Sequence, residues 1–596
     1  MKKFHWFVLL WTGLAIFMQV RQSGAQAQPD RDLLSDTWRV MDAQSRVLPD
    51  STQTRTRRHD RFVGIFYFLW HGGHGTPGPF DISKALAANP ANPTYGPEGA
   101  FHWWGEPETG YFLADDPWIL RRNLSLLQDA GVDVLLLDVT NAFTYPKELT
   151  ALCEMAAKMR GEGNQTPQIA FVTHARSAET VKKLWDEFYS KKRCPDLWFQ
   201  WRGKPLILGY ENDRLPGGQP LDLEVRRFFT WRESWAWEPG KHRWPWIERF
   251  PQRGGYDVDP DRPEEAPVSV ASHPTSNIGR SFHDEKEPPL NKLRLTAETA
   301  RGLHFAEQWH RLLALDPEFC FITGWNEWVA QRFTMRPNQG IQMMGRPLKA
   351  LDTFFVDAYN EEFSRDIEPM RGGYGDAYYW QMVDGIRRFK GVRPLQQGVR
   401  FKTLPTTGQF AQWQAVTPEY RDTIGDTAHR DWNGWGTLHY KNETGRNDIV
   451  AMKVACDTKF IYFWVQTHAP LTKYTDKNWM RLLIGSEKSL APGWEGYNFI
   501  VNNPVIDAKT TTLKRLSDGR IYKVSYRVAG NQMQIAIPRK FLLQNNPDRV
   551  AFQFHWLDNI AYGSDLSDWR LNGDSAPNGR ANYVYVNNQK EIEITD

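Results

Sequence analysis

An apolar run of strand length, Phe319–Gly324, stops abruptly in Trp325–Asn326–Glu327–Trp328. A buried strand that delivers a carboxylate at its C-terminal end is typical of (β/α)₈ barrels, because the barrel interior is packed and only the C-terminal rim is open. The run therefore predicts a barrel strand with Glu327 at the rim. The alternative is a strand end whose tryptophans pack under a loop and whose Glu327 pairs with an arginine.

The rest of the chain divides into two patterns. From Arg61 to Gly391, apolar runs alternate with amphipathic helical segments, which favours βα units and a parallel sheet. The runs Val134–Val139 and Gln168–Thr173 are predicted strands, and the segment Asp116–Ala130 is a predicted helix, with an acidic cap and a proline at its start and a glycine after its end. After Phe401, short strand-like runs separated by turn residues are typical of a β-sandwich. The predicted fold class is α/β: a (β/α)₈ TIM-type barrel over 61–391, a linker over 392–407 and an antiparallel β-sandwich over 408–596.

The N-terminus predicts export. Lys2 and Lys3 precede an apolar run, and Ala25–Gln26–Ala27 has the small-x-small pattern of a signal-peptidase site. We expect a signal peptide over 1–27, an N-terminal segment over 28–60 and a periplasmic or secreted protein, with no other segment apolar enough to span a membrane. The four cysteines lack metal-ligand spacing, which favours buried free thiols and leaves a Cys153–Cys194 disulfide open.

Composition narrows the class of ligand. The 73 basic and 70 acidic residues nearly cancel, so nothing resembles the electrostatic footprint of a nucleic-acid-binding protein. The chain holds 27 tryptophans among 596 residues, and indoles in excess of core needs usually contact flat apolar faces such as those of sugars. We therefore expect a polysaccharide or glycan partner and no organic cofactor. His71 and His74 lack a third ligand, so no metal is predicted.

Polar and aromatic residues gather where the predicted barrel strands end. Because those ends share one rim, we take them as candidate site residues. Asp138 closes an apolar strand, and it either faces the barrel mouth or pairs structurally with an arginine. The candidate catalytic residues are Glu327, Asp138 and Glu238, and the candidate substrate-binding residues are Tyr67, Trp70, His71, His102, Trp103, Trp104, Glu106, Asn141, His174, Trp325, Asn326 and Trp328.

Three of these elements carry a family resemblance. Gly64–Trp70, the strand bearing Asp138 and above all Trp325–Trp328 resemble the barrel of glycoside hydrolase families 71 and 99, which include α-glucanases and endo-α-mannosidases. The resemblance implies a glycoside hydrolase with Glu327 as one of its two catalytic carboxylates. In family 99 the second carboxylate follows three residues later, where this chain has Ala330.

The C-terminal region is similar to family 9-like carbohydrate-binding modules. The resemblance rests on two aromatic clusters, Asp431–Trp435 and Trp494–Phe499. It implies a sugar-stacking surface, although aromatic residues that bridge the two sheets of a sandwich fit the same pattern.

Ala330 leaves the second catalytic carboxylate open. Glycoside hydrolysis needs two carboxyl groups, about 5–5.5 Å apart for retention and about 6.5–9.5 Å for inversion. The candidates for the partner of Glu327 are Asp138, Glu238 and Glu106, in falling order. Glu361 and Glu362, in the charged run 357–366, are further possibilities, although that run also favours a structural salt-bridge network.

The leading hypothesis is an exported glycoside hydrolase that cleaves a polysaccharide or glycan by carboxylate acid/base catalysis. A non-catalytic glycan-binding protein of the cell surface or periplasm is the alternative, favoured by Ala330 or by a Glu327 sealed in an ion pair. A polysaccharide lyase also stays open, because it needs basic residues to neutralise a uronate, and Arg202, Arg232, Arg243 and Arg280 could supply them.

Overall fold

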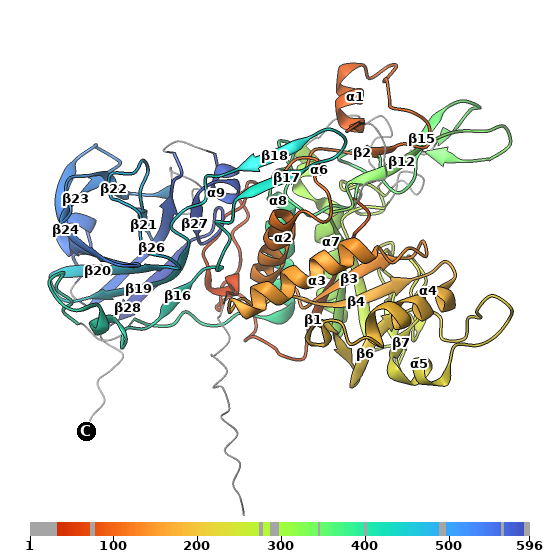
Figure 1. The fold of residues 1–596 in the computed structure, drawn as a ribbon, viewed down its shortest axis with the longest axis horizontal. Coiled ribbons are helices and arrows are strands. Elements are labelled where there is room, and N and C mark those ends of the chain that lie inside the picture. Colours follow the sequence, from red (N-terminus) through yellow and green to blue (C-terminus); the bar gives the residue numbers. More distant parts are fainter. Residues whose placement is uncertain are drawn as a thin grey trace, which may run out of the picture.

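The computed structural model describes residues 33–71, 78–272, 278–286, 297–343, 346–398, 402–487, 496–546, 548–561 and 565–588. The expected signal peptide, His74 and Trp494 lie outside these ranges. The described chain has an α/β part and an all-β part, side by side (Figure 1). No helix in the described ranges combines the length and apolarity needed to cross a bilayer.

Seven parallel strands form the centre of the α/β part. In spatial order they are β7 (Thr230–Arg232), β6 (Lys204–Leu208), β4 (Gln168–Thr173), β3 (Val134–Val139), β1 (Phe62–Tyr67), β11 (Phe319–Trp325) and β10 (Glu265–Ser269). Beyond β10 the sheet continues through the two-residue strands β9 (Gly255–Tyr256) and β8 (Gly240–Lys241), and β9 runs antiparallel to β10. The described strands thus form a half-barrel, and the predicted closed (β/α)₈ barrel is not confirmed.

Helices cover the convex face of this half-barrel. The principal ones are α2 (Pro117–Ala130), α3 (Pro146–Gly161), α4 (Ser177–Leu184), α7 (Leu303–Leu315) and α8 (Ala377–Lys390). The sequence predicted both ends of α2 correctly: Asp116 caps it by accepting a hydrogen bond from the Trp118 amide at 2.9 Å, and Gly131 ends it with φ 85°.

Alternation along the strands separates two hydrophobic clusters. Leu135 and Leu137 of β3 face the helices, whereas Val134 and Leu136 face the concave side. The concave cluster also includes Trp244 and Trp246, from the segment after β8. The interior of the half-barrel is therefore packed, and a ligand can reach only the ends of its strands.

The C-terminal part is a nearly closed antiparallel β structure. Its strands follow the order β16 (Glu419–Arg421), β19 (Ile449–Cys456), β20 (Phe460–Thr467), β25 (Gln532–Pro538), β24 (Ile521–Ala529), β23 (Thr510–Arg515), β22 (Phe499–Val505), β21 (Arg481–Ser486), β26 (Arg549–Asp558) and β27 (Asp574–Ala576), and β28 (Tyr583–Asn588) pairs with β26. The side chain of Tyr420 in β16 reaches β28, where its hydroxyl donates to the Val584 carbonyl at 2.9 Å. Eleven strands of the predicted β-sandwich region thus form one continuous sheet.

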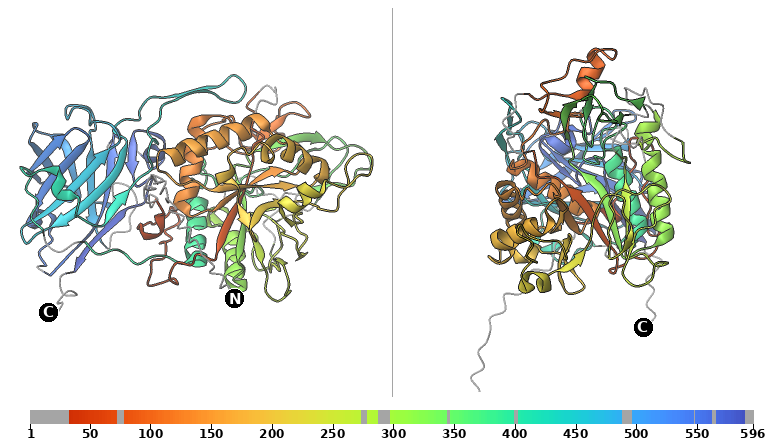
Figure 2. Two further views of the ribbon diagram at one scale, coloured as in Figure 1. Left: turned by 60° about the horizontal axis from the view of Figure 1, so that its bottom comes forward. Right: turned by 90° about the vertical axis from the view of Figure 1, so that its right-hand side faces the viewer.

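A hairpin and a set of ion pairs join the two parts. The hairpin of β17 (Arg430–Asn433) and β18 (His439–Asn442) extends from the β part over the half-barrel (Figures 1 and 2). Arg430 binds Asp116 at 2.8 Å, and the Trp435 ring contacts Trp103 with centroids 5.6 Å apart. The described part of the predicted linker is also attached at both ends, since Arg393 pairs with Asp36 and the Gly398 amide donates to Val586.

Candidate functional site

The carboxyl ends of the half-barrel strands carry a group of polar and aromatic side chains. Asp138, His174 and Tyr210 each lie two residues beyond a concave-facing residue, namely Leu136, Val172 and Leu208. By the strand period of two, they extend the concave face toward its open end. With Trp235 they form what we call the rim cluster.

Three members of the rim cluster contact one another. The His174 ring stacks on Trp235 with centroids 3.5 Å apart and planes 15° apart, and His174 Nδ1 lies 3.1 Å from the Tyr210 hydroxyl. Burial lowers the pKa of His174, which favours the neutral ring at pH 7. Trp237 follows Trp235, with ring centroids 6.1 Å apart, and is 52% exposed. The cluster thus offers aromatic faces and uncharged hydrogen-bonding groups, which suit a sugar.

Asp138 is the acidic member of the rim cluster. It is 6% exposed, and its Oδ1 accepts hydrogen bonds from the Thr140 amide at 3.0 Å and the Thr140 hydroxyl at 2.7 Å. Burial raises the pKa of Asp138 to about 6; the charge of Asp357 adds to the rise, while Thr140 and Arg365 oppose it. A carboxyl group with this pKa can both give and take a proton near neutral pH.

Glu327 is sealed in an ion pair. It is 2% exposed, and both carboxylate oxygens accept from the Arg365 guanidinium, Oε2 from Nε at 2.7 Å and Oε1 from Nη2. Its backbone amide donates to Asp366 Oδ1 at 2.7 Å. Burial raises the pKa of Glu327, and the Arg365 guanidinium opposes that rise. Of the two roles that the sequence left open for Glu327, the structure therefore shows the second, a strand-end carboxylate paired with an arginine. In this position Glu327 is almost completely covered by protein atoms.

Arg365 also connects Glu327 to a carboxylate that the sequence did not single out. Asp357 Oδ1 lies 3.8 Å from Arg365 Nη2, and the Asp357 side chain is 41% exposed. Its charge raises the pKa of Asp138, so the two carboxyl groups are electrostatic neighbours. Asp357 follows no barrel strand, and the charged run around it predicts only a salt-bridge network. No local pattern could have placed it here.

Most of the predicted substrate-binding residues are core residues in the structure. Trp104 stacks on Trp328 with centroids 4.6 Å apart, and Asn326 bonds both backbone groups of Phe68, at 2.8 and 3.0 Å. These residues follow the apolar strands because the space under the adjoining loops has to be filled. The indole rings fill that space, and the Asn326 amide satisfies the backbone groups that are buried there. The residues buried in this way are Tyr67, His71, His102, Trp103, Trp104, Trp325, Asn326 and Trp328.

The remaining predicted residues lie nearer to solvent. Trp70 is partly buried against Phe68, and exposed Asn141 donates to the Tyr145 hydroxyl at 2.9 Å. Glu238 is exposed and lies 3.5 Å from Arg243, whereas Glu106 pairs with Lys84 and Arg371. The structure thus leaves Trp70, Asn141 and His174 at the open end as candidate contacts. Two predicted catalytic carboxylates also lie there, Asp138 and Glu238, and the charge of Glu238 acts on His174 and Tyr210.

The arginines that kept a lyase open are already paired. Arg232 and Arg202 both bind the buried Glu264, and Arg243 binds Glu233 at 3.1 Å. Arg280 is fully buried over the rings of Tyr374 and Tyr378. In the described part of the chain, each of these four guanidinium groups thus already contacts a carboxylate or aromatic rings.

This chain is similar to solved protein structures at low sequence identity. No protein-family model and no curated protein matches this chain. Two solved structures of the GH99 endo-α-mannosidase from Bacteroides thetaiotaomicron, one in complex with BIS-TRIS-Propane, are similar to it. The complex is 14% identical with a TM-score of 0.32, covering 55% of this chain and 97% of the other; the second is 17% identical with a TM-score of 0.33, covering 56% and 99%.

Proposed function

We propose that this chain is a glycoside hydrolase that binds a glycan at the open end of the half-barrel, with Asp138 as the proton donor. One observation carries the proposal: a carboxyl group with a pKa of about 6 stands among the aromatic and neutral polar side chains of the rim cluster. An acid that is still protonated near pH 6 can protonate the oxygen of a leaving sugar.

Asp357 is the proposed second carboxylate. It is accessible, and its charge acts on Asp138, as expected of two groups on opposite sides of one glycosidic bond. In this scheme Glu327 does not react. It holds Arg365, which in turn lies beside Asp357, so Glu327 acts as a positioning residue.

Asp138→Asn tests the proposal. The amide oxygen can still accept the Thr140 hydrogen bonds, whereas the amide cannot donate a proton to a leaving oxygen. Turnover on the best substrate from a panel of α- and β-linked polysaccharides should fall about a thousandfold or more, with binding retained. Asp186→Asn, on the exposed face after α4, is the control and should keep full activity. Unchanged turnover in Asp138→Asn would refute the assignment.

A glycan-binding protein without catalysis is the second candidate. It is favoured by the sealed Glu327 and by Ala330, which is 1% exposed and pairs with His102 between β12 (Val329–Thr334) and β2 (Phe101–Trp103). Under this alternative, calorimetry would detect glycan binding that Trp235→Ala weakens, while no reducing ends are released from any polysaccharide.

Export is a further part of the proposal, and it rests on the sequence pattern over 1–27. We expect a periplasmic or secreted protein whose mature chain begins at Gln28. Mass spectrometry of the protein recovered from its native host would detect this cleavage, and an intact N-terminus would contradict it.

A further inference from the structure

Two of the four cysteines contact each other among the helices of the half-barrel. Cys153 lies in α3, and Cys194 lies between the helical turn η2 (Trp185–Tyr189) and the short helix η3 (Pro195–Leu197). Both are thiols in the structure, and a hydrogen bond joins their side chains. Because the two residues are far apart along the chain, the sequence left a disulfide between them open, and only the fold shows the contact.

The other two cysteines lie elsewhere in the fold. Cys320 lies in the buried strand β11 of the half-barrel. Cys456 lies in β19 of the β part, where its sulfur accepts a hydrogen bond from the Tyr585 hydroxyl at 3.5 Å. All four cysteines belong to the described ranges, and among them the pair Cys153 and Cys194 is the one in which two thiols meet.

A cavity lies beside the pair. It measures about 420 Å³, and Cys153 and Cys194 line it together with apolar side chains such as Leu149, Leu184 and Phe188. Cys153 is 4% exposed, whereas Cys194 is only partly buried. A dissolved oxidant can therefore reach Cys194 first. The open space also lets the two side chains change rotamer without displacing close-packed neighbours.

The two thiols differ in acidity. The hydrogen bond with Cys153 lowers the pKa of Cys194 to about 7, and the charge of Arg193 acts in the same direction against the effect of burial. The same hydrogen bond, together with burial, raises the pKa of Cys153. Since the thiolate is the form that attacks a disulfide, Cys194 is the nucleophile of the pair near neutral pH.

We propose that Cys153 and Cys194 form a disulfide bond once the chain has left the cytoplasm. The proposal rests on the export proposed above, because disulfides persist in oxidising compartments. The Cys194 thiolate attacks one sulfur of a disulfide oxidant and releases the other as a thiolate. Cys153 then loses its proton and attacks Cys194 Sγ, which releases the second thiolate. The pair thus gives up two electrons and two protons, and the oxidant becomes two thiols.

The bond would tie α3 to the segment before η3. The loop that it closes contains β4 and α4, so the two residues are distant in the unfolded chain and adjacent in the folded one. A cross-link of this kind stabilises a protein mainly by restricting the unfolded chain. We therefore expect the oxidised protein to have a higher Tm than the reduced protein, by about 4 °C.

Thiol mapping of the full chain tests the bond. The protein is incubated with oxidised glutathione or with dithiothreitol, unfolded in guanidinium chloride and alkylated with iodoacetamide. Mass spectrometry should find only Cys320 and Cys456 alkylated after glutathione, and all four cysteines after dithiothreitol. Alkylation of all four cysteines after both treatments would overturn the proposal, and so would a glutathione adduct that persists on Cys194.

Three variants assign the stabilisation to this pair. Cys153→Ala and Cys194→Ser should each abolish the difference in Tm between the oxidised and reduced protein. Cys320→Ala, with its thiol in β11, is the control and should keep that difference whatever its own stability. A difference that survives in Cys194→Ser would contradict the assignment. The added glutathione supplies the oxidant and no readout measures turnover, so failure here is distinct from a failure of export or of glycoside hydrolysis.

Discussion

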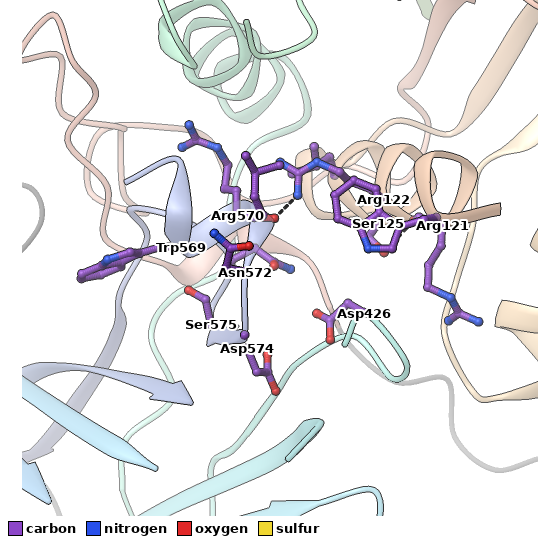
Figure 3. A pocket seen from close by; sticks show the side chains of 14 residues that line it. Arg121, Arg122, Ser125, Asp426, Trp569, Arg570, Asn572, Asp574 and Ser575 are labelled. Carbon is purple, nitrogen blue, oxygen red and sulfur yellow. Dashed lines mark hydrogen bonds between the residues drawn. The ribbon is translucent and has the colours of Figure 1, made fainter. Parts of the chain in front are cut away.

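Two regions of this molecule bury carboxylates in opposite ways. Behind the rim, Glu327 has both oxygens on Arg365, and at the junction Asp376 binds both Arg570 and Arg580, at 2.6 and 2.7 Å. At the same junction (Figure 3), one carboxylate oxygen from each of Asp422, Asp426 and Asp574 lies within 4.8 Å of the other two, and Arg121, which acts electrostatically on Asp426, binds Glu162. The comparison shows that a buried carboxylate can be understood only after the cationic groups around it have been identified. Carboxylates that bind arginines hold the fold together, whereas Asp426 and Asp574 each keep an oxygen that accepts no hydrogen bond among the described residues.

The largest expected loss of stability follows from removing the charge of Asp376, which binds two arginines. Asp376→Asn removes the anion between two buried arginines, and we expect the free energy of unfolding to fall by about 4 kcal/mol. The two guanidinium groups hold the pKa of Asp376 below its usual range, so its stabilisation is present above the unfolded pKa of about 3.9 and is lost as pH falls below it. Urea denaturation at pH 7 measures the change, and a loss under about 1 kcal/mol would break the comparison.

Glu327→Gln should have the next largest effect. The substitution leaves Arg365 buried without a full counter-charge, and we expect a loss of about 3 kcal/mol in unfolding free energy. The same change at exposed Glu238 is the matched control and should cost less than about 0.5 kcal/mol. Equal stabilities of the two variants would mean that the Arg365 pair contributes nothing.

The raised pKa of Asp138, a carboxyl group without a directly bound arginine, should make the free energy of unfolding depend on pH. Its folded pKa of about 6 exceeds the unfolded value of about 3.9, so its contribution to stability is full below about pH 4 and is lost as pH rises through about 6. Asp138→Asn should therefore match the wild type near pH 4 and exceed its unfolding free energy by about 2 kcal/mol at pH 7.5. As a proton donor, Asp138 should also make turnover fall above about pH 6. A stability difference that does not change with pH would contradict the raised pKa.

The smallest expected change in stability concerns Asp448, whose charge lies beside the crowded aspartates Asp426 and Asp574. Asp448→Asn keeps an oxygen for the Gly425 amide, which Asp448 Oδ2 accepts at 2.9 Å, while it removes one charge beside Asp426 and Asp574. The variant should be more stable than the wild type by about 1 kcal/mol. Differential scanning calorimetry measures this gain, and a loss of stability would mean that the charge of Asp448 stabilises the junction.

The sequence predicted what depends on local pattern. The apolar runs of β3, β4 and β11 and the caps of α2 follow from hydrophobicity and capping residues, and the structure has them at or near the predicted positions. Barrel closure was beyond such patterns, because the two-residue strands β8 and β9 carry almost no periodic signal.

The candidate site was predicted only in part, for a physical reason. A tryptophan or asparagine after an apolar strand has the same local pattern whether it lies partly buried near the open end, like Trp70, or packs in the core, like Trp103. The arginine that seals Glu327 lies 38 residues further along the chain, and the aspartates at the junction come from separate strands. Contacts of this range follow from tertiary structure alone.

The β17–β18 hairpin has a consequence for the order in which the chain folds. Trp103 packs against Trp435, and the Tyr111 amide donates to the Tyr440 hydroxyl at 2.7 Å, so the α/β core is completed by residues over 300 positions later. Contacts between such distant residues form late, because the intervening chain must first be brought together. Until the hairpin has been synthesised, the N-terminal part therefore exposes the surface that the hairpin covers in the complete chain.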